Sequence, residues 1–121
     1  MFTVMVESGF AASHALLLAD GTRERRHVHD WRVRVAVSAD KLDAAGLAVD
    51  FLYIKAVMDD ITGPMTRVEL EDLPYFRGKN ASAERVAVYF YEQVAGRLKD
   101  RIALEYVEVM EAAGCWVKFT R

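Results

Sequence analysis

Residues 27–38 read HVHDWRVRVAVS, and from Trp31 to Val37 every second side chain is apolar. Such alternation is typical of a β-strand with one face buried in a core. Side chains alternate between the two faces of a sheet, so His27 and His29 share the face of Trp31 if the strand reaches back that far. This stretch therefore predicts a strand over residues 31–38, which carries two imidazoles on its buried face if it extends back to His27.

Similar patterns on both sides of this strand predict the rest of the fold. Asp50 and Ser82 are candidate N-caps of two helices, and Phe51 is expected on the buried face of the first. The predicted elements, in order, are strands at residues 2–10 and 31–38, helices that begin after Asp50 and after Ser82, and strands at 102–109 and 115–119. This order predicts an α+β fold, with a four-stranded antiparallel sheet and two helices on one face, as a single domain over residues 1–121. The open edges of such a sheet favour oligomerisation.

The composition excludes several classes of protein. Hydrophobic residues make up 53% of the 121 residues and charged residues 28%, as in a folded globular chain and unlike a disordered one. Sixteen Lys and Arg against 18 Asp and Glu leave a formal charge of −2, which argues against a nucleic-acid partner. No apolar stretch approaches the ~20 residues of a membrane helix, and no secretory signal is visible. The one cysteine, Cys115, is expected to be a small buried side chain, and a cytoplasmic location is expected.

The chain has three histidines, and the predicted strands bring them together. His14 follows the first strand on the parity of Phe10, so a hairpin would place it beside His27 and His29. Three imidazoles with an open fourth position are the ligand set of a catalytic zinc. The alternative is that each is an ordinary hydrogen-bonded side chain, since a His-x-His pair also arises by chance.

Five segments, taken in order, resemble one known family. They are FAASH at residues 10–14, HVH at 27–29, GLAVDF at 46–51, NASAE at 80–84 and VEVME at 107–111. The 6-pyruvoyltetrahydropterin synthase / 6-carboxytetrahydropterin synthase family carries F-x-A-x-H, H-G-H, G-x-x-x-D-F, N-P-T-S-E and V-x-V-x-E in that order. The resemblance spans nearly the whole chain and implies the family's T-fold.

The resemblance also implies a site and an assembly. His14, His27 and His29 would hold Zn²⁺, and Glu111 would anchor the ring of a pterin substrate through paired hydrogen bonds. Ser82, in the NASAE segment, would contribute to substrate binding. Members of the family form trimers that stack into hexamers, with the pocket between subunits. For Glu111, the alternative is an exposed acid at a strand end.

Three positions depart from the family's pattern. The family's catalytic cysteine, four residues before the first histidine of H-G-H, corresponds to Arg23 here. Thr66 and Arg67 stand where the family has an Asp-His pair that assists proton transfer, and Val28 replaces the glycine of H-G-H. The family's usual proton transfer therefore cannot operate in this chain.

Glu24 offers a substitute for the missing cysteine. Residues 24–29 read E-x-x-H-x-H, which resembles a branch of the family in which a glutamate replaces the cysteine. That branch cleaves the side chain of 7,8-dihydroneopterin triphosphate to give 6-hydroxymethyl-7,8-dihydropterin. The resemblance implies that Glu24 is a general base, while the alternative is a solvated acid in a charged surface loop.

Two functions remain open from the sequence. The first is a zinc-dependent pterin lyase acting on 7,8-dihydroneopterin triphosphate or a related small pterin. The second is a re-purposed or non-catalytic relative that keeps the zinc site and binds a pterin- or purine-like ligand.

Overall fold

A computed structural model describes residues 1–121 as one four-stranded antiparallel sheet with two α-helices. Its elements are β1 (Phe2–His14), β2 (His27–Ala39), α1 (Phe51–Thr62), α2 (Ala83–Ala95), β3 (Ala103–Ala112) and β4 (Cys115–Phe119). The strands pair in the order β1-β2-β3-β4, so sequence neighbours are also neighbours in the sheet. The predicted α+β fold and the predicted order of elements are confirmed.

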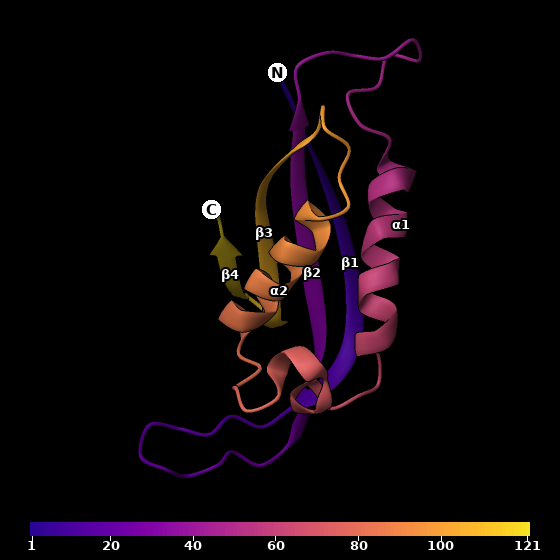
Figure 1. Ribbon diagram of the computed structural model, residues 1–121. Helices are drawn as coiled ribbons and strands as arrows, with labels where there is room; N and C mark the ends of the chain where they lie inside the picture. Colours follow the sequence, from indigo (N-terminus) through magenta and orange to yellow (C-terminus); the bar gives the residue numbers. More distant parts are fainter.

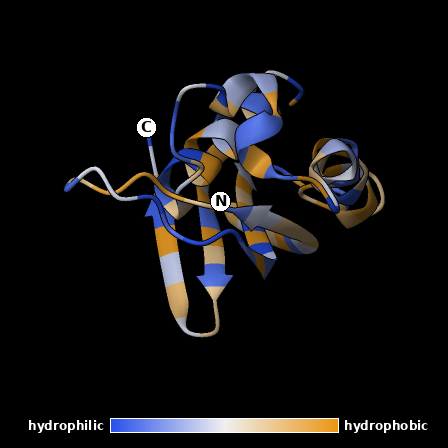
Figure 2. Ribbon diagram, turned by 90° about the horizontal axis from the view of Figure 1, so that it is seen from below, coloured by the Kyte–Doolittle hydropathy of each residue, from blue (hydrophilic) through white to orange (hydrophobic).

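Both helices pack on the sheet, α1 along β1 and α2 against β3 and β4 (Figure 1). The covered face carries alternate side chains of the strands, such as Trp31, Val35 and Val107, all of them fully buried. Figure 2 shows this alternation as hydrophobic and hydrophilic bands along the strands. From the helices, the core receives apolar side chains at helical spacing: Ile54, Val57, Met58 and Ile61 from α1, and Val86, Phe90 and Val94 from α2.

Each helix begins where a capping side chain accepts a backbone hydrogen bond. Asp50 accepts from the backbone N–H of Leu52, and Ser82 accepts from that of Arg85. The expected burial of Phe51 is wrong, because its side chain is 61% exposed. Helical side chains lean toward the helix N-terminus, so the first residue of α1 points past the end of the helix rather than onto the core.

β1 and β2 are longer than their apolar pattern suggested, and this extension forms the site. They pair without interruption from Phe2↔Ala39 to His14↔His27. Phe10 stacks on Trp31 with ring centroids 5.9 Å apart, and the Trp31 indole N–H donates to the Ala12 carbonyl. These contacts hold the ends of both strands against the core.

Residues 63–76 contain three short 3₁₀ turns that cover the outer edge of β1 near its end. Arg67 N–H donates to the Ala11 carbonyl, and Ser13 N–H donates to the Val68 carbonyl. Leu70 and Phe76 are fully buried and anchor the segment in the core.

Cys115 is exposed, so the prediction of a buried side chain is wrong. It is the first residue of β4, directly after the turn at Gly114, and β4 lies at the edge of the sheet. None of the helices is both long and apolar enough to span a bilayer.

Candidate metal centre

The three histidines meet at one end of the sheet. His14 and His27 are directly opposite each other in the β1–β2 ladder, and His29 follows two residues later on the same face. One ring nitrogen from each lies within 4.8 Å of the other two. His14 is 1% exposed, whereas the His29 side chain is 22% exposed, so the cluster opens from a buried floor toward the surface.

Hydrogen bonds on the outer side of two rings orient their inner nitrogens. Nδ1 of His14 lies 2.9 Å from the Ala81 carbonyl oxygen, and Nδ1 of His27 lies 2.7 Å from that of Arg25. A carbonyl oxygen only accepts, so we infer that both Nδ1 atoms carry the proton. In the neutral rings, both Nε2 atoms then present a lone pair.

These lone pairs are the main indication that a cation belongs between the rings. Nε2 of His14 and Nε2 of His27 are only 3.0 Å apart, and two facing lone pairs repel each other unless a proton or a metal ion lies between them. Nε2 of His29 is also buried and has no hydrogen-bond partner. Zinc binds imidazole at ~2.0–2.1 Å with tetrahedral geometry, which spaces its nitrogen ligands about 3.3 Å apart. The three residues therefore fit a zinc ion with small side-chain adjustments.

The surroundings of His29 favour its neutral, metal-binding form. Burial lowers the pKa of His29 below its usual 6.5, and the nearby His14 and His27 act in the same direction. Glu111 and, more weakly, Glu24 oppose this effect through their negative charge. A neutral imidazole is the form that ligates a metal.

Glu111 lies at the edge of the histidine cluster. Its carboxylate oxygens are 3.5 Å from Nε2 of His14 and 4.0 Å from Nε2 of His29. Where β3 pairs with β4, Met110 lies opposite Trp116 and Ala112 lies opposite Cys115. No residue of β4 lies opposite Glu111, which is therefore the extra residue of a β-bulge in β3. A bulge turns a side chain away from the regular alternation, and such bulges are common beside functional sites.

Glu24 lies in the loop between β1 and β2, where it forms two hydrogen bonds with the backbone of Leu16. Its backbone N–H donates to the Leu16 carbonyl at 2.8 Å, and its Oε1 accepts from the Leu16 N–H at 3.1 Å. The side chain is partly buried rather than fully solvated. Its negative charge opposes the lowering of the His29 pKa, more weakly than that of Glu111 does.

Of the remaining predicted positions, Ser82 lies at the start of α2, where its hydroxyl oxygen accepts the capping bond from Arg85.

Val28 is 69% exposed, and its position between His27 and His29 directs it to the opposite face of the sheet. The change from glycine to valine therefore leaves the histidine face unaltered.

Glu71 has a role in the site that the sequence analysis missed. Its Oε1 accepts from the Ala15 N–H at 3.0 Å, and its Oε2 accepts from the Ala81 N–H at 3.1 Å. Ala15 follows His14 directly, and the Ala81 carbonyl faces the His14 ring. One carboxylate thus ties together both chain segments that position His14. No local pattern distinguishes Glu71 from its acidic neighbours Glu69 and Asp72.

Comparisons with known proteins agree on one family. A family model described as 6-pyruvoyl tetrahydropterin synthase matches residues 3–121. Among solved structures, the Caenorhabditis elegans 6-pyruvoyl tetrahydropterin synthase superposes with a TM-score of 0.84 at 18% identity, covering 99% of this chain and 95% of that one. The Plasmodium falciparum 6-pyruvoyl tetrahydropterin synthase gives a TM-score of 0.78 at 19% identity, covering 99% and 97%.

A third similar structure is the Plasmodium vivax 6-pyruvoyltetrahydropterin synthase in which a catalytic glutamate is replaced by alanine. It gives a TM-score of 0.74 at 17% identity, covering 99% of this chain and 97% of that one. At these identities the likeness to solved structures shows a shared fold. No protein with a curated description matches the sequence.

Proposed function

The chain belongs to the 6-pyruvoyl tetrahydropterin synthase family, and we propose on that premise that it is a zinc-dependent lyase acting on a pterin. The proposed substrate is 7,8-dihydroneopterin triphosphate or a close relative with a hydroxylated side chain. The observation that carries the proposal is the pair of facing Nε2 atoms of His14 and His27, 3.0 Å apart, next to the unpartnered Nε2 of His29.

The three histidines would hold the metal, and the Ala81 and Arg25 carbonyls would keep two of the rings in the right tautomer. Bound there, zinc would supply Lewis acidity that holds the side-chain hydroxyls and makes them more acidic. The aromatic layer of Phe10 and Trp31 beneath His14 excludes water from below, so a ligand would approach from the side of His29.

Glu111 would bind and orient the pterin ring. A carboxylate accepts two hydrogen bonds from the amino-pyrimidine edge of a pterin, and such charge-assisted pairs are strong and directional. Glu111 is partly buried, and the bulge in β3 aims its oxygens at the cluster. Ser82 stays a candidate for a second contact, since its hydroxyl hydrogen is free to donate while its oxygen caps α2.

Glu24 would move the proton in the step for which most of the family uses a cysteine. One of its oxygens is held by the Leu16 N–H, which leaves the other free to accept a proton from the substrate side chain. The Plasmodium vivax enzyme, where a glutamate is a catalytic residue, offers a parallel for this role.

We also propose that the protein works as a homo-oligomer, a trimer or a hexamer, as the family resemblance implies. None of the five main surface hollows of the single chain is lined by the three histidines. A second subunit packed beside them would complete a pocket around the substrate. The cytoplasmic location stays a prediction from the sequence.

The alternative is a relative that binds a pterin- or purine-like ligand without converting it. This alternative is supported by Thr66 and Arg67, which stand where the family has the Asp-His pair that assists proton transfer. The Thr66 hydroxyl donates to the Thr62 carbonyl within its own turn, and Arg67 has a positive φ of 61°. Neither side chain can assume the acid–base role of aspartate and histidine.

Mass-spectrometric product analysis tests the proposal. Zinc-loaded protein is incubated with 7,8-dihydroneopterin triphosphate, beside Glu24→Gln and His27→Gln. We expect a 6-substituted pterin product from the parent protein. Glu24→Gln should retain its zinc and the Leu16 contact but lose turnover by about 10²-fold or more, as for loss of a general base. His27→Gln should lose zinc itself.

Each failure has a separate meaning. Zinc binding without any product would favour the non-catalytic alternative. Full activity in Glu24→Gln would remove Glu24 from the mechanism, and full zinc content in His27→Gln would overturn the metal site.

A further inference from the structure

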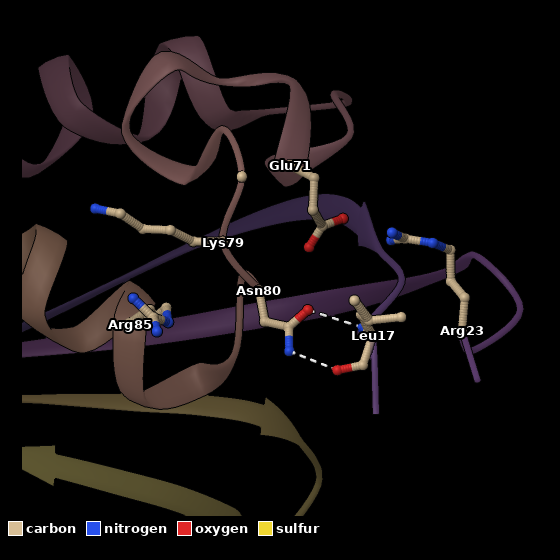
Figure 3. Close-up of a pocket in the computed structure, with 7 residues that line it drawn as sticks. Leu17, Arg23, Glu71, Lys79, Asn80 and Arg85 are labelled. Atoms are coloured by element: carbon tan, nitrogen blue, oxygen red, sulfur yellow. Dashed lines mark hydrogen bonds between the residues drawn. The ribbon is translucent and has the colours of Figure 1, made fainter. Parts of the chain in front are cut away.

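Two of the surface hollows lie at opposite ends of the sheet. The one shown in Figure 3 adjoins the histidine cluster, because Glu71 lines it and also holds the backbone beside His14. The other, of about 250 Å³, lies between the loop that joins β2 to α1 and the loop that joins α2 to β3. Figure 1 shows both of these loops at the end of the sheet away from the 15–26 loop. The second hollow is therefore remote from the candidate metal centre.

This second hollow, called the charged hollow below, has two walls of opposite charge. Asp43 and Asp50 line it from the loop between β2 and α1, whereas Lys99 and Arg101 line it from the loop between α2 and β3. The ion pairs of the chain all involve other residues. Two carboxylates and two cations thus surround one small hollow without forming ion pairs with each other.

Backbone hydrogen bonds hold each carboxylate on its own wall. Oδ1 of Asp43 accepts from the N–H groups of Ala45 and Leu47, at 2.9 and 3.0 Å. Oδ1 of Asp50 accepts the capping bond of α1 from the Leu52 N–H, at 2.9 Å. Both side chains are exposed, and the Oδ2 atoms take no part in these bonds. Each carboxylate can therefore accept a hydrogen bond from a ligand and keep the bonds that position it.

The two cations are held on the other wall in a similar way. Nη1 of Arg101 donates to the Ala48 carbonyl at 3.0 Å, which leaves Nη2 free to donate. Nζ of Lys99 lies 4.9 Å from the centre of the Tyr53 ring, a cation–π contact that uses none of its N–H donors in a hydrogen bond. The Tyr53 hydroxyl donates to the Arg97 carbonyl at 2.7 Å, which fixes the ring against the loop that carries Lys99.

We propose that the charged hollow binds a free α-amino acid, with its ammonium group against the acidic wall and its carboxylate against the basic wall. A zwitterion matches both walls at once, whereas an anion would also lie beside two carboxylates and a cation beside two positive side chains. The hydrogen bonds to both ends of the ligand would be charge-assisted. This inference is independent of the proposed pterin chemistry, since it concerns the opposite end of the sheet.

The size and the apolar part of the hollow define the ligand further. Its volume is below the about 300–1,000 Å³ of pockets that hold drug-sized ligands, so it suits a small molecule. Val49 and Ile102, which are both buried, also line it. These apolar surfaces favour an amino acid with an aliphatic side chain over glycine, because such a side chain leaves water when it binds.

Calorimetric titration of the full chain with L-leucine tests the proposal, at about pH 6.5, where the α-amino and α-carboxyl groups are both charged. Two analogues each lack one charge: leucinamide has no carboxylate, and 4-methylpentanoate has no ammonium group. We expect L-leucine to bind at least about tenfold more tightly than either analogue, since each analogue loses its charge-assisted hydrogen bonds to one wall. Equal affinity for an analogue, or no binding of L-leucine, would overturn the proposal.

Variants with one charge removed locate the binding. Asp43→Asn keeps an oxygen for the loop backbone, and it and Arg101→Gln should each weaken L-leucine binding by about tenfold. Lys99→Gln removes the other cation of the basic wall and serves if Arg101→Gln fails to fold. Asp40→Asn and Lys41→Gln are matched controls, because they remove the same charges from residues near Asp43 that do not line the hollow.

The controls should bind L-leucine like the parent protein. Equal weakening in the controls and in the variants of the hollow would reduce the effect to net charge and overturn the site. Unchanged binding in every variant would assign the amino acid to another place, such as a metal ion at the histidines, and would overturn the site as well.

Discussion

His14 couples the site to the core more tightly than either of its two partners. Its ring contacts His27 and His29 on one side and lies edge-on to Trp31 on the other, with ring centroids 5.1 Å apart. Its Nδ1 is fixed by the Ala81 carbonyl, which belongs to a segment 67 residues away in the chain. A metal bound here would therefore brace the end of the sheet as well as serve in chemistry.

Among the residues that hold His14 in place, Glu71 should be the one whose replacement has the largest effect. Glu71→Ala leaves the buried N–H groups of Ala15 and Ala81 without acceptors, so we expect the free energy of unfolding to fall by about 2–4 kcal/mol. Urea denaturation measures this loss, and metal titration should show weaker zinc binding. Glu69→Ala is the control: it removes only the partly exposed ion pair with Arg26, which contributes about 1 kcal/mol or less. A similar loss in both variants would argue against a bracing role for Glu71.

At the scale of elements, the start of α2 combines a structural role with a proposed binding role. Ser82 is its N-cap and is also the residue proposed to make a second contact with the substrate. The capping bond fixes where the helix begins, and so it also fixes the position of the Ser82 hydroxyl at the end of the helix.

Ser82 variants separate the cap from the binding role. Ser82→Ala removes the cap and should lower the free energy of unfolding by about 1 kcal/mol, while Ser82→Asp restores a capping oxygen and should keep most of the stability. Thermal denaturation measures both effects. Pterin affinity should fall in both variants if the hydroxyl contacts the ligand. Unchanged affinity in Ser82→Asp would leave Ser82 with its capping role alone.

The 3₁₀ segment and α2 also share a pair of tyrosines that responds to high pH. Tyr75 and Tyr89 lie with ring centroids 4.7 Å apart. Burial raises the pKa of both phenols above the usual 10.0, and Glu92 adds to the effect at Tyr75.

Because these pKa values are raised in the folded state, the unfolded chain loses the phenol protons first. The contribution of the two tyrosines to stability is complete below about pH 10 and falls as pH rises beyond it. As pH is raised from about 9 to about 11, the free energy of unfolding should therefore fall less in the double variant Tyr75→Phe/Tyr89→Phe than in the parent protein. Urea denaturation at each pH measures this difference. An equal loss in both proteins would contradict the assignment to these side chains.

At the scale of the whole molecule, the sheet has two open edges, β1 and β4. Ala11 and Ser13 direct their backbone groups outward, where they bond to Arg67 and Val68. β1 pairs with β2 without a register shift, so every second residue of β1 has the same orientation. The backbone N–H and C=O groups of Thr3 and Met5 therefore point outward as well. The part of β1 beyond the 3₁₀ segment is thus available to pair with another chain.

Thr3→Pro tests whether this edge holds the proposed oligomer together. Proline removes an outward N–H and leaves the ladder with β2 intact, so the subunit should fold normally. We expect light scattering to give a multiple of 13.7 kDa for the parent protein and a lower mass for Thr3→Pro. Thr3→Val, which keeps the N–H, should retain the parent mass. An unchanged mass in Thr3→Pro would exclude this edge from the interface.

The order of the elements, the strand parity of the histidines and both helix caps could be predicted from the sequence. These features depend on local patterns: alternation along a strand, helical spacing, and a capping residue before a helix. His27 and His29 are two residues apart on one strand, so their shared face follows from the geometry of the strand alone.

Only the tertiary structure determined the rest of the site. Strand parity predicted that a hairpin would place His14 beside His27 and His29, but the register that puts His14 directly opposite His27 depends on β1 and β2 pairing to their very ends. The position of Glu111 depends on a bulge opposite β4. Glu71 comes from a segment far from His14 in the chain, and nothing near it in the sequence distinguishes it. Cys115 is exposed because β4 is an edge strand, which only its neighbours in the sheet determine. Local pattern decides which face a side chain takes, whereas long-range packing decides what that side chain meets.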